Sequence, residues 1–352
     1  MRLDEPPWWY GGAGDVRQRV LSPIGRLYGW IAERRYRQKM PYRSRLPVIC
    51  VGNFTAGGTG KTPLSISIAK LLISRGEHPV FLTRGYGGSS TGPEWVATVP
   101  EAARRFGDEP LLLAATAPTL VARDRRGGII TIERDVRAPS VVIMDDGLQN
   151  AAVAKDLTIA LVDGRRGIGN GEVIPAGPLR APLDFQLGLV DTIVVRDPSD
   201  EGGERTVLSV LRQGFPGPVL TARTAAAGET AWLAEKPLVA FAGIANPRRF
   251  YRLLEGLGGQ LADAVSFPDH YDFTTADAQR LLTLAEAKRA RLVTTEKDYV
   301  RLAGEGALAA LRSRSRVLPI TIEIEGREAE RLNSLIDAAL KGTARRTSPP
   351  AA

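Results

Sequence analysis

Short apolar runs rich in β-branched residues alternate, along the first two thirds of the chain, with segments that have helical or loop character. These runs predict strands at residues 46–51, 80–83, 119–122, 141–144, 157–162 and 192–195. Such alternation is typical of a mostly parallel sheet with helices on both faces. Ligands of these sheets bind at the carboxyl ends of the strands. The polar residues that follow each run are therefore where we look for chemistry.

A second, shorter series of the same kind follows a small, polar stretch. It predicts strands at 238–242, 291–294 and 317–321 and helices at 247–257 and 327–340. A further helix is opened by the capping pattern Thr274-Thr-Ala-Asp277. We therefore predict a large α/β unit over residues 43–223, a linker over 224–236 and a smaller C-terminal α/β domain over 237–341. Residues 342–352 are predicted to be a disordered tail.

The N-terminal segment, residues 1–42, predicts a basic amphipathic helix. Ser22-Pro23 is read as its cap and first turn, and Ile24, Leu27, Tyr28 and Ile31 then recur at helical spacing. Cations accompany this apolar face at Arg26, Arg34, Arg35, Arg37 and Lys39. The pattern is typical of a helix that lies on an anionic membrane surface. A helix packed on its own domain has an apolar stripe too, so both interpretations stay open.

Composition narrows the class of protein. The chain has 352 residues, with 47 basic and 39 acidic side chains and a net charge of +8. That charge attracts anions, whether nucleic acid, acidic lipid or phosphorylated small molecules, and does not choose among them. The single cysteine excludes a disulfide framework and favours a reducing compartment. No apolar run approaches the ~18 residues of a spanning helix, so we expect a chain that is neither transmembrane nor exported.

A glycine-rich loop directly after the first predicted strand carries the clearest chemical signal. It comprises Thr55, Ala56, Gly57, Gly58, Thr59, Gly60, Lys61 and Thr62 and leads into a helix. Such a loop points backbone N–H groups at a phosphate, while its lysine reaches the outer phosphates and its last hydroxyl binds Mg²⁺. The general pattern has glycine at the first place, where this chain has Thr55. The loop predicts binding of a nucleoside triphosphate.

Carboxylates end a later strand in the form expected of a second nucleotide motif. Residues 141–144 are apolar, and Asp145 and Asp146 follow at the end of the run. Together with Thr62 they are predicted to hold Mg²⁺. The alternative is a plain strand that ends in an Asp-Gly turn. A further acidic site, Asp108 within Gly107-Asp-Glu-Pro110, is weak by itself and is also compatible with a turn and helix start.

Two other polar features remain open on the residues alone. His270 lies in a loop dense in polar and aromatic residues and is a candidate for proton transfer, whereas His78 is predicted to lie in a solvated turn. The glycine-rich stretch 163–180 contains Arg165, Arg166 and Arg180, which could meet phosphate or solvent.

Seven motifs together resemble one family, tetraacyldisaccharide 4′-kinase, the lipid A 4′-kinase of Gram-negative bacteria. They are spread over nearly the whole chain: Gly52-Asn-Phe-Thr-Ala-Gly-Gly-Thr-Gly-Lys-Thr62, Thr83-Arg-Gly-Tyr-Gly-Gly88, Gly107-Asp-Glu-Pro110, Asp145-Asp-Gly-Leu-Gln149, Gly169-Asn-Gly171 with Pro175-Ala-Gly-Pro-Leu-Arg180, Phe267-Pro-Asp-His270 and Thr294-Thr-Glu-Lys-Asp298.

This resemblance implies a P-loop NTPase-like kinase with ATP and Mg²⁺ as cofactors. The γ-phosphate would pass to the 4′-hydroxyl of a tetraacylated glucosamine disaccharide 1-phosphate, the lipid A precursor, at the cytoplasmic face of the inner membrane. Asp108 would take the hydroxyl proton, His270 would orient or charge Asp108, and Lys61 would hold the phosphates. The chain departs from the family at Asn150 and Ala181, where relatives often have His and Glu, so roles of those side chains do not transfer.

Two rival functions come from other classes. A membrane-associated P-loop ATPase switch also has a phosphate loop and an amphipathic anchor, but such proteins have a second lysine just before the glycine pair, where this chain has Ala56. A nucleic-acid-dependent ATPase would suit the positive charge, but the chain lacks the interleaved aromatic and basic residues that stack on bases. We therefore expect no nucleic-acid partner, and no obligate protein partner is evident.

Overall fold

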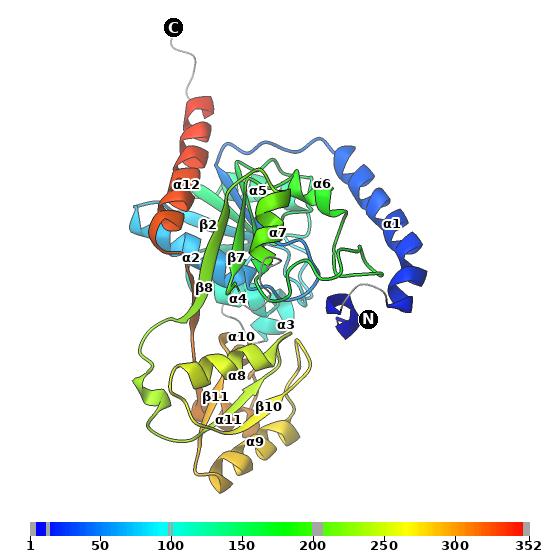
Figure 1. The fold of residues 1–352 in the computed structure, drawn as a ribbon. Coiled ribbons are helices and arrows are strands. Elements are labelled where there is room, and N and C mark those ends of the chain that lie inside the picture. Colours follow the sequence, from blue (N-terminus) through cyan, green and yellow to red (C-terminus); the bar gives the residue numbers. More distant parts are fainter. Residues whose placement is uncertain (1–4, 12–14, 98, 100, 199–206, 348–352) are drawn as a thin grey trace.

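The strands of the computed structural model form two sheets, one of nine strands and one of four. The smaller sheet lies below the larger one in Figure 1. The structure describes residues 5–11, 15–97, 99, 101–198 and 207–347, with side chains up to residue 342.

The large sheet is parallel except at its two edges. Its strands are β1 (Val48–Gly52), β2 (Pro79–Thr83), β3 (Glu94–Trp95), β4 (Thr119–Val121), β5 (Val141–Asp145), β6 (Leu157–Asp163), β7 (Thr192–Arg196), β8 (Val219–Ala226) and β13 (Ile320–Glu323). Their spatial order is β13-β8-β7-β6-β1-β5-β2-β4-β3, and only β3 and β13 run antiparallel to their neighbours. The prediction of a mostly parallel α/β sheet is confirmed.

Helices cover both faces of this sheet, because both faces of the central strands are apolar. On β1, Ile49 and Val51 point to a core shared with α2 (Lys61–Ser74), α4 (Asp108–Ala114) and α12 (Gly326–Thr347). Val48 and Cys50 point the other way, to the face covered by α5 (Arg125–Glu133), α6 (Leu183–Leu187) and α7 (Val207–Gly214). The short helix α3 (Ala102–Phe106) precedes α4. A strand buried on both faces reads as a continuous apolar run, which is why the sequence marks it clearly.

The small sheet is wholly parallel and has its own core. Its strands are β9 (Leu238–Ala242), β10 (Leu261–Ser266), β11 (Arg291–Thr294) and β12 (Ser315–Val317), in the order β10-β9-β11-β12. Helix α8 (Pro247–Gly256) covers one face, and α9 (Thr275–Ala287) and α11 (Ala307–Arg314) cover the other. The short helix α10 (Glu296–Tyr299) follows β11. The predicted capping box of α9 is present, with Thr274 and Asp277 bonded to each other's backbone N–H.

The sequence predicts that residues 237–341 all belong to the smaller domain. In the structure, the last part of this range leaves the small sheet and returns to the large one. The single strand expected at 317–321 is two strands, and Pro319, which has no N–H to donate, separates them. The second of them, β13, pairs with β8 in the large sheet, and α12 packs on the large sheet after it. Strand β8 also extends into the predicted linker, and the short helix η3 (Ala231–Leu233) lies within it. Two chain segments thus join the sheets.

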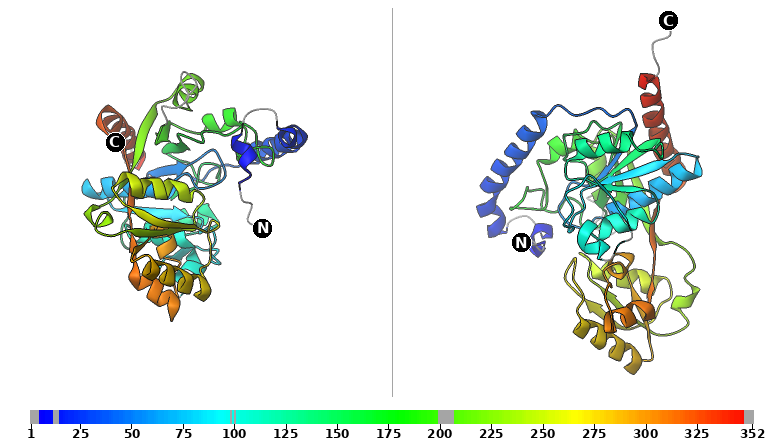
Figure 2. Two further views of the ribbon diagram at one scale, coloured as in Figure 1. Left: turned by 60° about the horizontal axis from the view of Figure 1, so that its bottom comes forward. Right: turned by 180° about the vertical axis from the view of Figure 1, so that it is seen from behind.

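Helix α12 continues to Thr347, so the tail predicted from residue 342 is helical in its first part. The rest of that prediction, residues 348–352, lies outside the described residues. Figure 2 shows α12 and helix α1 (Val16–Arg37) on different sides of the large sheet.

Helix α1 starts earlier than predicted. Its cap is Asp15, whose side chain accepts from the Arg17 N–H, and Pro23 lies inside the helix rather than in its first turn. Pro23 leaves the carbonyl of Arg19 without its helical donor, and Arg19 is exposed, so water can replace that bond. The helix contacts the body through Gly25 and Gly29, where a Cβ would clash with Val173 and crowd Pro182. Among the described helices, none combines the length and the apolar character needed to cross a bilayer.

Candidate active site

The phosphate loop connects β1 to α2 at the carboxyl edge of the large sheet. Gly57 and Gly60 have φ of 89° and 93°, a left-handed conformation that favours glycine. The Thr59 hydroxyl is buried and has no hydrogen-bond partner. Thr55 stands where the general pattern has glycine. It does not have a positive φ, so a side chain at this position causes no backbone strain. A loop with a buried, unpaired hydroxyl is a suitable cradle for an anion.

Residues 175–180 form hydrogen bonds with the first residues of the phosphate loop. The Ala56 N–H donates to the Pro178 carbonyl at 2.8 Å, and the Arg180 N–H donates to the Phe54 carbonyl at 2.9 Å. Arg180 also donates from Nε to the Thr55 carbonyl at 3.0 Å. The proline-rich stretch therefore holds the first half of the phosphate loop in place.

Lys61 is buried and already has acceptors within the protein. Its Nζ lies 3.3 Å from Asn53 Oδ1 and 3.6 Å from Asp146 Oδ1. These acceptors place the ammonium group between the loop and the acidic end of β5. A triphosphate seated in the loop would take over part of this coordination.

Asp145, the last residue of β5, faces the start of α2. Its carboxylate accepts from Ser65 Oγ at 2.7 Å and from Thr62 Oγ1 at 3.4 Å. Burial, together with the negative charge of Glu109, raises the pKa of Asp145 to about 7. This side chain is therefore a buried carboxyl group among hydroxyls, poised to lose its proton when a cation arrives.

Asp146 lies in a different environment. It has a φ of 54°, and its Oδ1 accepts from Arg180 Nη1 at 2.8 Å. Burial alone would raise the pKa of Asp146, but Arg180 and Lys61 beside it hold that pKa well below its usual range. Asp145 and Asp146 are equivalent in the sequence, but their neighbours shift their pKa values in opposite directions.

The oxygen atoms of these side chains can be compared with the ligands that Mg²⁺ prefers. Thr62 and Asp145 offer a hydroxyl and a carboxylate oxygen 3.4 Å apart at the loop. Within the described part of the chain, no cluster of three or more acidic, histidine or cysteine side chains could hold a metal by itself. Mg²⁺ usually takes one or two carboxylates and completes its shell with substrate phosphates and water. A site that relies on a bound triphosphate therefore fits the residues present.

A second cluster of charges joins the two sheets. Asp108, the buried first residue of α4, contacts Arg301, whose Nη2 donates to its Oδ2. Lys297 Nζ lies 3.8 Å and His270 Nδ1 lies 3.4 Å from the same oxygen. No described residue donates to Asp108 Oδ1, so this oxygen is free to meet a substrate hydroxyl. Burial would raise the pKa of Asp108, but the His270 hydrogen bond and the two cations lower it well below its usual range.

The end of β9 positions the groups that come from the small sheet. The Gly243 carbonyl accepts from the His270 N–H at 3.1 Å and from Arg301 Nη1 at 2.9 Å. Asp298, fully buried, accepts from the Gly243 N–H and from Arg301 Nη1, both at 3.1 Å. His270 itself has a φ of 56°. The small sheet thus presents His270 and Arg301 as one preassembled unit to Asp108.

A neutral His270 ring has two alternative hydrogen-bond arrangements. Arg301 Nη2 lies 3.2 Å from Nδ1, and Lys297 Nζ lies 3.1 Å from Nε2. Both cations only donate, while a neutral imidazole accepts at one nitrogen only. Either Nδ1–H donates to Asp108 and Nε2 accepts from Lys297, or Nδ1 accepts from Arg301 and Nε2–H faces Asp269 at 3.8 Å. The tautomer therefore selects whether His270 bonds Asp108 directly.

The predicted site residues form two neighbouring groups. Lys61, Thr62, Asp145 and Asp146 gather at the phosphate loop, and Asp108 and His270 meet beside it although 162 positions separate them in the sequence. Glu109, adjacent to Asp108, links the groups through its charge on Asp145 and its 3.5 Å contact with Lys297.

Sequence reasoning gave no role to several side chains that complete the site. They are Asn53, Ser65, Lys297 and Arg301. The stretch Thr294-Thr-Glu-Lys-Asp298 contains Lys297 and follows a predicted strand, which was the available signal. The sequence leaves Arg180 open as a contact of phosphate or of solvent, and in the structure it pairs with Asp146.

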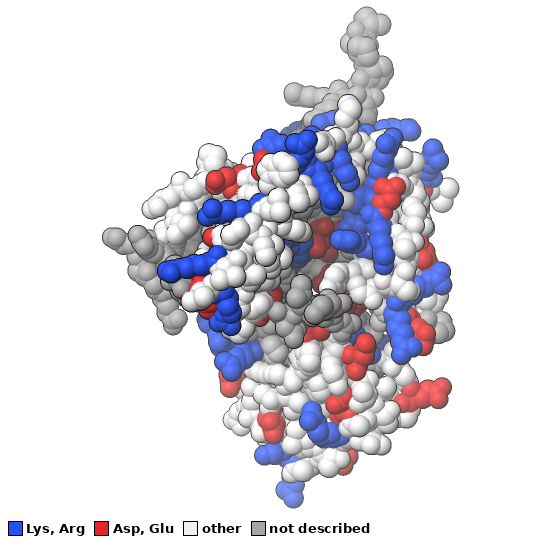
Figure 3. Space-filling view, turned by 90° about the vertical axis from the view of Figure 1, so that its right-hand side faces the viewer, with Lys and Arg blue, Asp and Glu red and all other residues white. Residues whose placement is uncertain are grey.

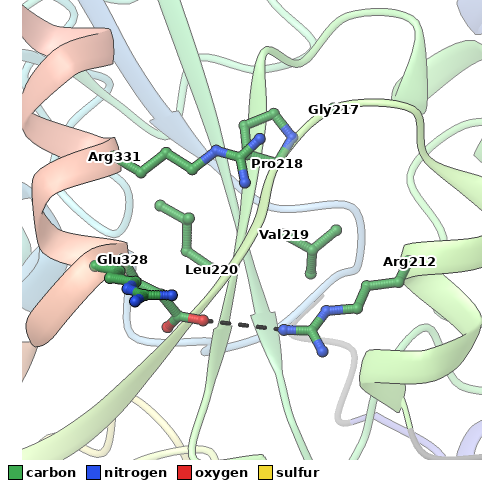
Figure 4. A pocket seen from close by; sticks show the side chains of 8 residues that line it. Arg212, Gly217, Pro218, Val219, Leu220, Glu328 and Arg331 are labelled. Atoms are coloured by element: carbon green, nitrogen blue, oxygen red, sulfur yellow. Dashed lines mark ion pairs between the residues drawn. The ribbon is translucent and has the colours of Figure 1, made fainter.

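A separate cavity of about 380 Å³ lies at the amino end of β8, between α7 and α12. Figure 4 shows Arg212 and Glu328 facing each other across it, 3.9 Å apart. Glu328 also accepts from the Thr221 N–H at 2.6 Å. None of the predicted site residues lines this cavity.

Comparison with known proteins gives one family. The family model described as tetraacyldisaccharide-1-P 4′-kinase matches residues 17–341. A protein named tetraacyldisaccharide 4′-kinase from Paramagnetospirillum magneticum is 44% identical over 305 residues, which are 87% of this chain and 90% of that protein. A protein of the same name from Bradyrhizobium sp. strain BTAi1 is 41% identical over 99% of this chain and 98% of its own length.

A solved structure agrees with these relatives. The crystal structure titled as the "apo" form of LpxK from Aquifex aeolicus in complex with ATP superposes with a TM-score of 0.70 at 26% identity. The match covers 92% of this chain and 99% of that one.

Proposed function

The chain belongs to the tetraacyldisaccharide-1-P 4′-kinase family, and on that premise we propose its reaction in detail. It transfers the γ-phosphate of ATP to the 4′-hydroxyl of a tetraacylated glucosamine disaccharide 1-phosphate. The observation that carries the proposal is the meeting of Asp108 and His270 beside the phosphate loop, with the Oδ1 of Asp108 free for an acceptor.

The phosphate loop holds the triphosphate. Backbone N–H groups and Lys61 carry the charge of the β- and γ-phosphates, and their positions are fixed before the reaction. Mg²⁺, held by Thr62 and Asp145, would neutralise charge that develops on the phosphates. Asp146 contributes at a distance, because it orients Lys61 and Arg180 rather than meeting the metal.

Asp108 receives the acceptor hydroxyl. Since bond making to the nucleophile lags behind bond breaking in most phosphoryl transfers, the proton leaves late, and a carboxylate with a lowered pKa still orients the hydroxyl. The cations Lys297 and Arg301 keep Asp108 ionised, and His270 sets which hydrogen bonds its Oδ2 accepts. Because these groups come from both sheets, the acceptor site is complete only when the sheets are in contact.

The direct test of this function uses the purified protein with γ-labelled ATP, Mg²⁺ and a tetraacyl disaccharide 1-phosphate in detergent. We expect the label to appear in the lipid as a 4′-phosphate monoester. Label that remains in ATP or appears only as inorganic phosphate would contradict the proposal. Omission of the lipid should leave ATP turnover low, as an acceptor-dependent kinase requires.

Asp145 makes the metal requirement depend on pH. Its raised pKa of about 7 means that its proton competes with Mg²⁺. On lowering the pH from about 8 to about 6, the Mg²⁺ concentration for half-maximal activity should therefore rise by about tenfold, as expected for one competing proton. Steady-state titration with Mg²⁺ at several pH values measures this. In Asp145→Asn, which has lost the titrating group, activity should be low and the residual Mg²⁺ requirement should depend on pH less than in the unaltered protein.

Helix α1 is proposed to seat the protein on the anionic inner-membrane surface, at its cytoplasmic face. Its apolar residues Val16, Val20, Ile24 and Leu27 are between 55% and 70% exposed. Exposed cations lie along the same helix, and Figure 3 shows Lys and Arg gathered on the upper part of the molecular face that carries it. An apolar row with flanking cations suits an interfacial helix, and the lipid acceptor resides in the same layer.

The double variant Val20→Asp, Leu27→Asp should weaken binding to anionic vesicles at least about tenfold, since burial of one such side chain contributes about 1.5–3 kcal/mol. Both side chains are more than half exposed, so the fold should be unaffected. Cosedimentation with vesicles measures the effect. Val136→Asp, at a 99% exposed valine away from α1, is the matched control. Equal sedimentation of both variants would place the membrane contact elsewhere.

A further inference from the structure

The segment before α1, Glu5–Gly11, lies on the glycine-rich loops around the phosphate loop. Trp9, in the short helix η1 (Pro7–Tyr10), is 4% exposed. Its Nε1 donates to the Pro175 carbonyl at 3.2 Å, and its own carbonyl accepts from the Asn170 N–H at 2.8 Å. The Arg166 guanidinium lies over the Tyr10 ring, 4.9 Å from its centre. The segment is thus anchored on the 166–175 loop.

From this anchor, the side chain of Glu5 reaches the phosphate loop itself. A Cβ on Gly57 would overlap Glu5 Oε1, so the carboxylate lies directly on the backbone of the third loop residue. Its other oxygen, Oε2, accepts from Arg166 Nη1 at 2.7 Å. An anion of the protein therefore lies against the phosphate loop at Gly57, although no loop N–H of the described chain donates to Oε1.

The contact between Glu5 and the phosphate loop is energetically unfavourable for a carboxylate. Oε1 is buried and has no hydrogen-bond partner. Burial raises the pKa of Glu5, although the charge of Arg166 and a hydrogen bond with Tyr10 lower it, and the charges of Asp269 and Asp163 add to the increase. A buried anion with an unsatisfied oxygen is costly to keep in place. The outer phosphate of ATP, which has more acceptor oxygens and more charge, would satisfy both the loop and Arg166 better.

We propose that the segment Glu5–Gly11 is an intramolecular cover of the phosphate loop, in which Glu5 competes with the outer phosphate of ATP. Seating of α1 on a membrane draws the cover away and lets the triphosphate bind. This release step rests on the membrane role proposed for α1, whose first residue, Val16, is only five positions after Gly11. The family match starts at residue 17, so the cover lies outside the matched segment.

The competition predicts a change in ATP affinity that needs no lipid acceptor. If the covered state holds about nine tenths of the molecules, removal of the cover lowers the apparent Kd for ATP about tenfold. Glu5→Ala removes the carboxylate, and Trp9→Ala loosens the anchor without a change of charge. Both variants should bind ATP about tenfold more tightly than the unaltered chain in buffer. Glu330→Ala, at an exposed glutamate of α12, should have no effect.

Calorimetric titration of the full-length protein with ATP and Mg²⁺ measures these constants, with and without vesicles of phosphatidylethanolamine and phosphatidylglycerol. Vesicles should tighten ATP binding by the unaltered chain to the level of Glu5→Ala and should add little to the variant. Unchanged affinity of Glu5→Ala in buffer would overturn the cover. Tighter binding by Glu5→Ala without any vesicle effect on the unaltered chain would overturn its release by the membrane. These titrations contain no lipid acceptor, so their outcome does not depend on the proposed kinase reaction. Failure of the labelled-lipid assay would therefore contradict the proposed function without contradicting the cover.

Discussion

The variant Lys61→Ala should retain its fold and lose nearly all phosphoryl transfer. Lys61 is the one side-chain cation of the phosphate loop, and its Nζ is held between Asn53 and Asp146, where the outer phosphates would lie. Removal of a preorganised charge at the transferring group costs about 10²- to 10³-fold in kcat. Label transfer to the lipid in detergent, at saturating ATP and Mg²⁺, measures this loss.

The matched control is Lys70→Ala, on the same helix α2 but exposed. It should leave the rate unchanged. Stability should not fall sharply in Lys61→Ala, because Asp146 keeps its 2.8 Å ion pair with Arg180. Retention of more than about a tenth of the activity by Lys61→Ala would remove Lys61 from the transfer step.

The elements found from the sequence are those whose signal is local. Strands such as β1 and β5 are buried on both faces and read as unbroken apolar runs, and the loop after β1 needs glycine at Gly57 and Gly60 for reasons of backbone geometry alone. Parallel strands bring their carboxyl ends to one edge, so the nearness of Asp145 to the phosphate loop was predictable once both motifs had been placed on neighbouring strands.

The elements that were missed depend on contacts between distant parts of the chain. Strand β10 lies at an edge and has no buried residue, and β8 becomes more exposed where it leaves the core, so neither gives an unbroken apolar run. The return of β13 to β8 is a pairing across about 100 positions, which no local pattern encodes. The same holds for Arg301, which the sequence does not distinguish from any other surface cation until the fold places it on Asp108.

Asp145 and Asp146 illustrate the remaining limit. The sequence gives both the same chemistry, and the prediction assigned both to the metal. Their neighbours differ, since Ser65 and Thr62 face Asp145 while Arg180 and Lys61 face Asp146. Of the two carboxylates, Asp146 is the one in ion pairs, with Arg180 and Lys61. Our proposal that Asp145 rather than Asp146 holds Mg²⁺ therefore rests on charges that come from residues elsewhere along the chain.

Asp108 and His270 are expected to act as one unit in catalysis. They come from opposite sheets, and His270 reaches Asp108 Oδ2 at 3.4 Å only because Gly243 and Asp298 fix its loop beside Arg301. If His270 acts only by setting the hydrogen bonds of Asp108, removal of His270 should lower kcat no further in a variant that already lacks the Asp108 carboxylate. We therefore expect the two losses not to multiply.

Asp108→Asn keeps the shape of the side chain and should lower kcat by about 10²- to 10⁴-fold, the usual range for a general base. His270→Ala should lower it by a smaller factor, and the double variant should be little worse than Asp108→Asn alone. His78→Ala, at the other histidine of the chain, which is exposed, is the control and should have no effect. Rates of labelled-lipid formation under saturating ATP give all four values. A double variant whose loss equals the product of the two single losses would show that the residues act independently, and His270 would then need a role apart from Asp108.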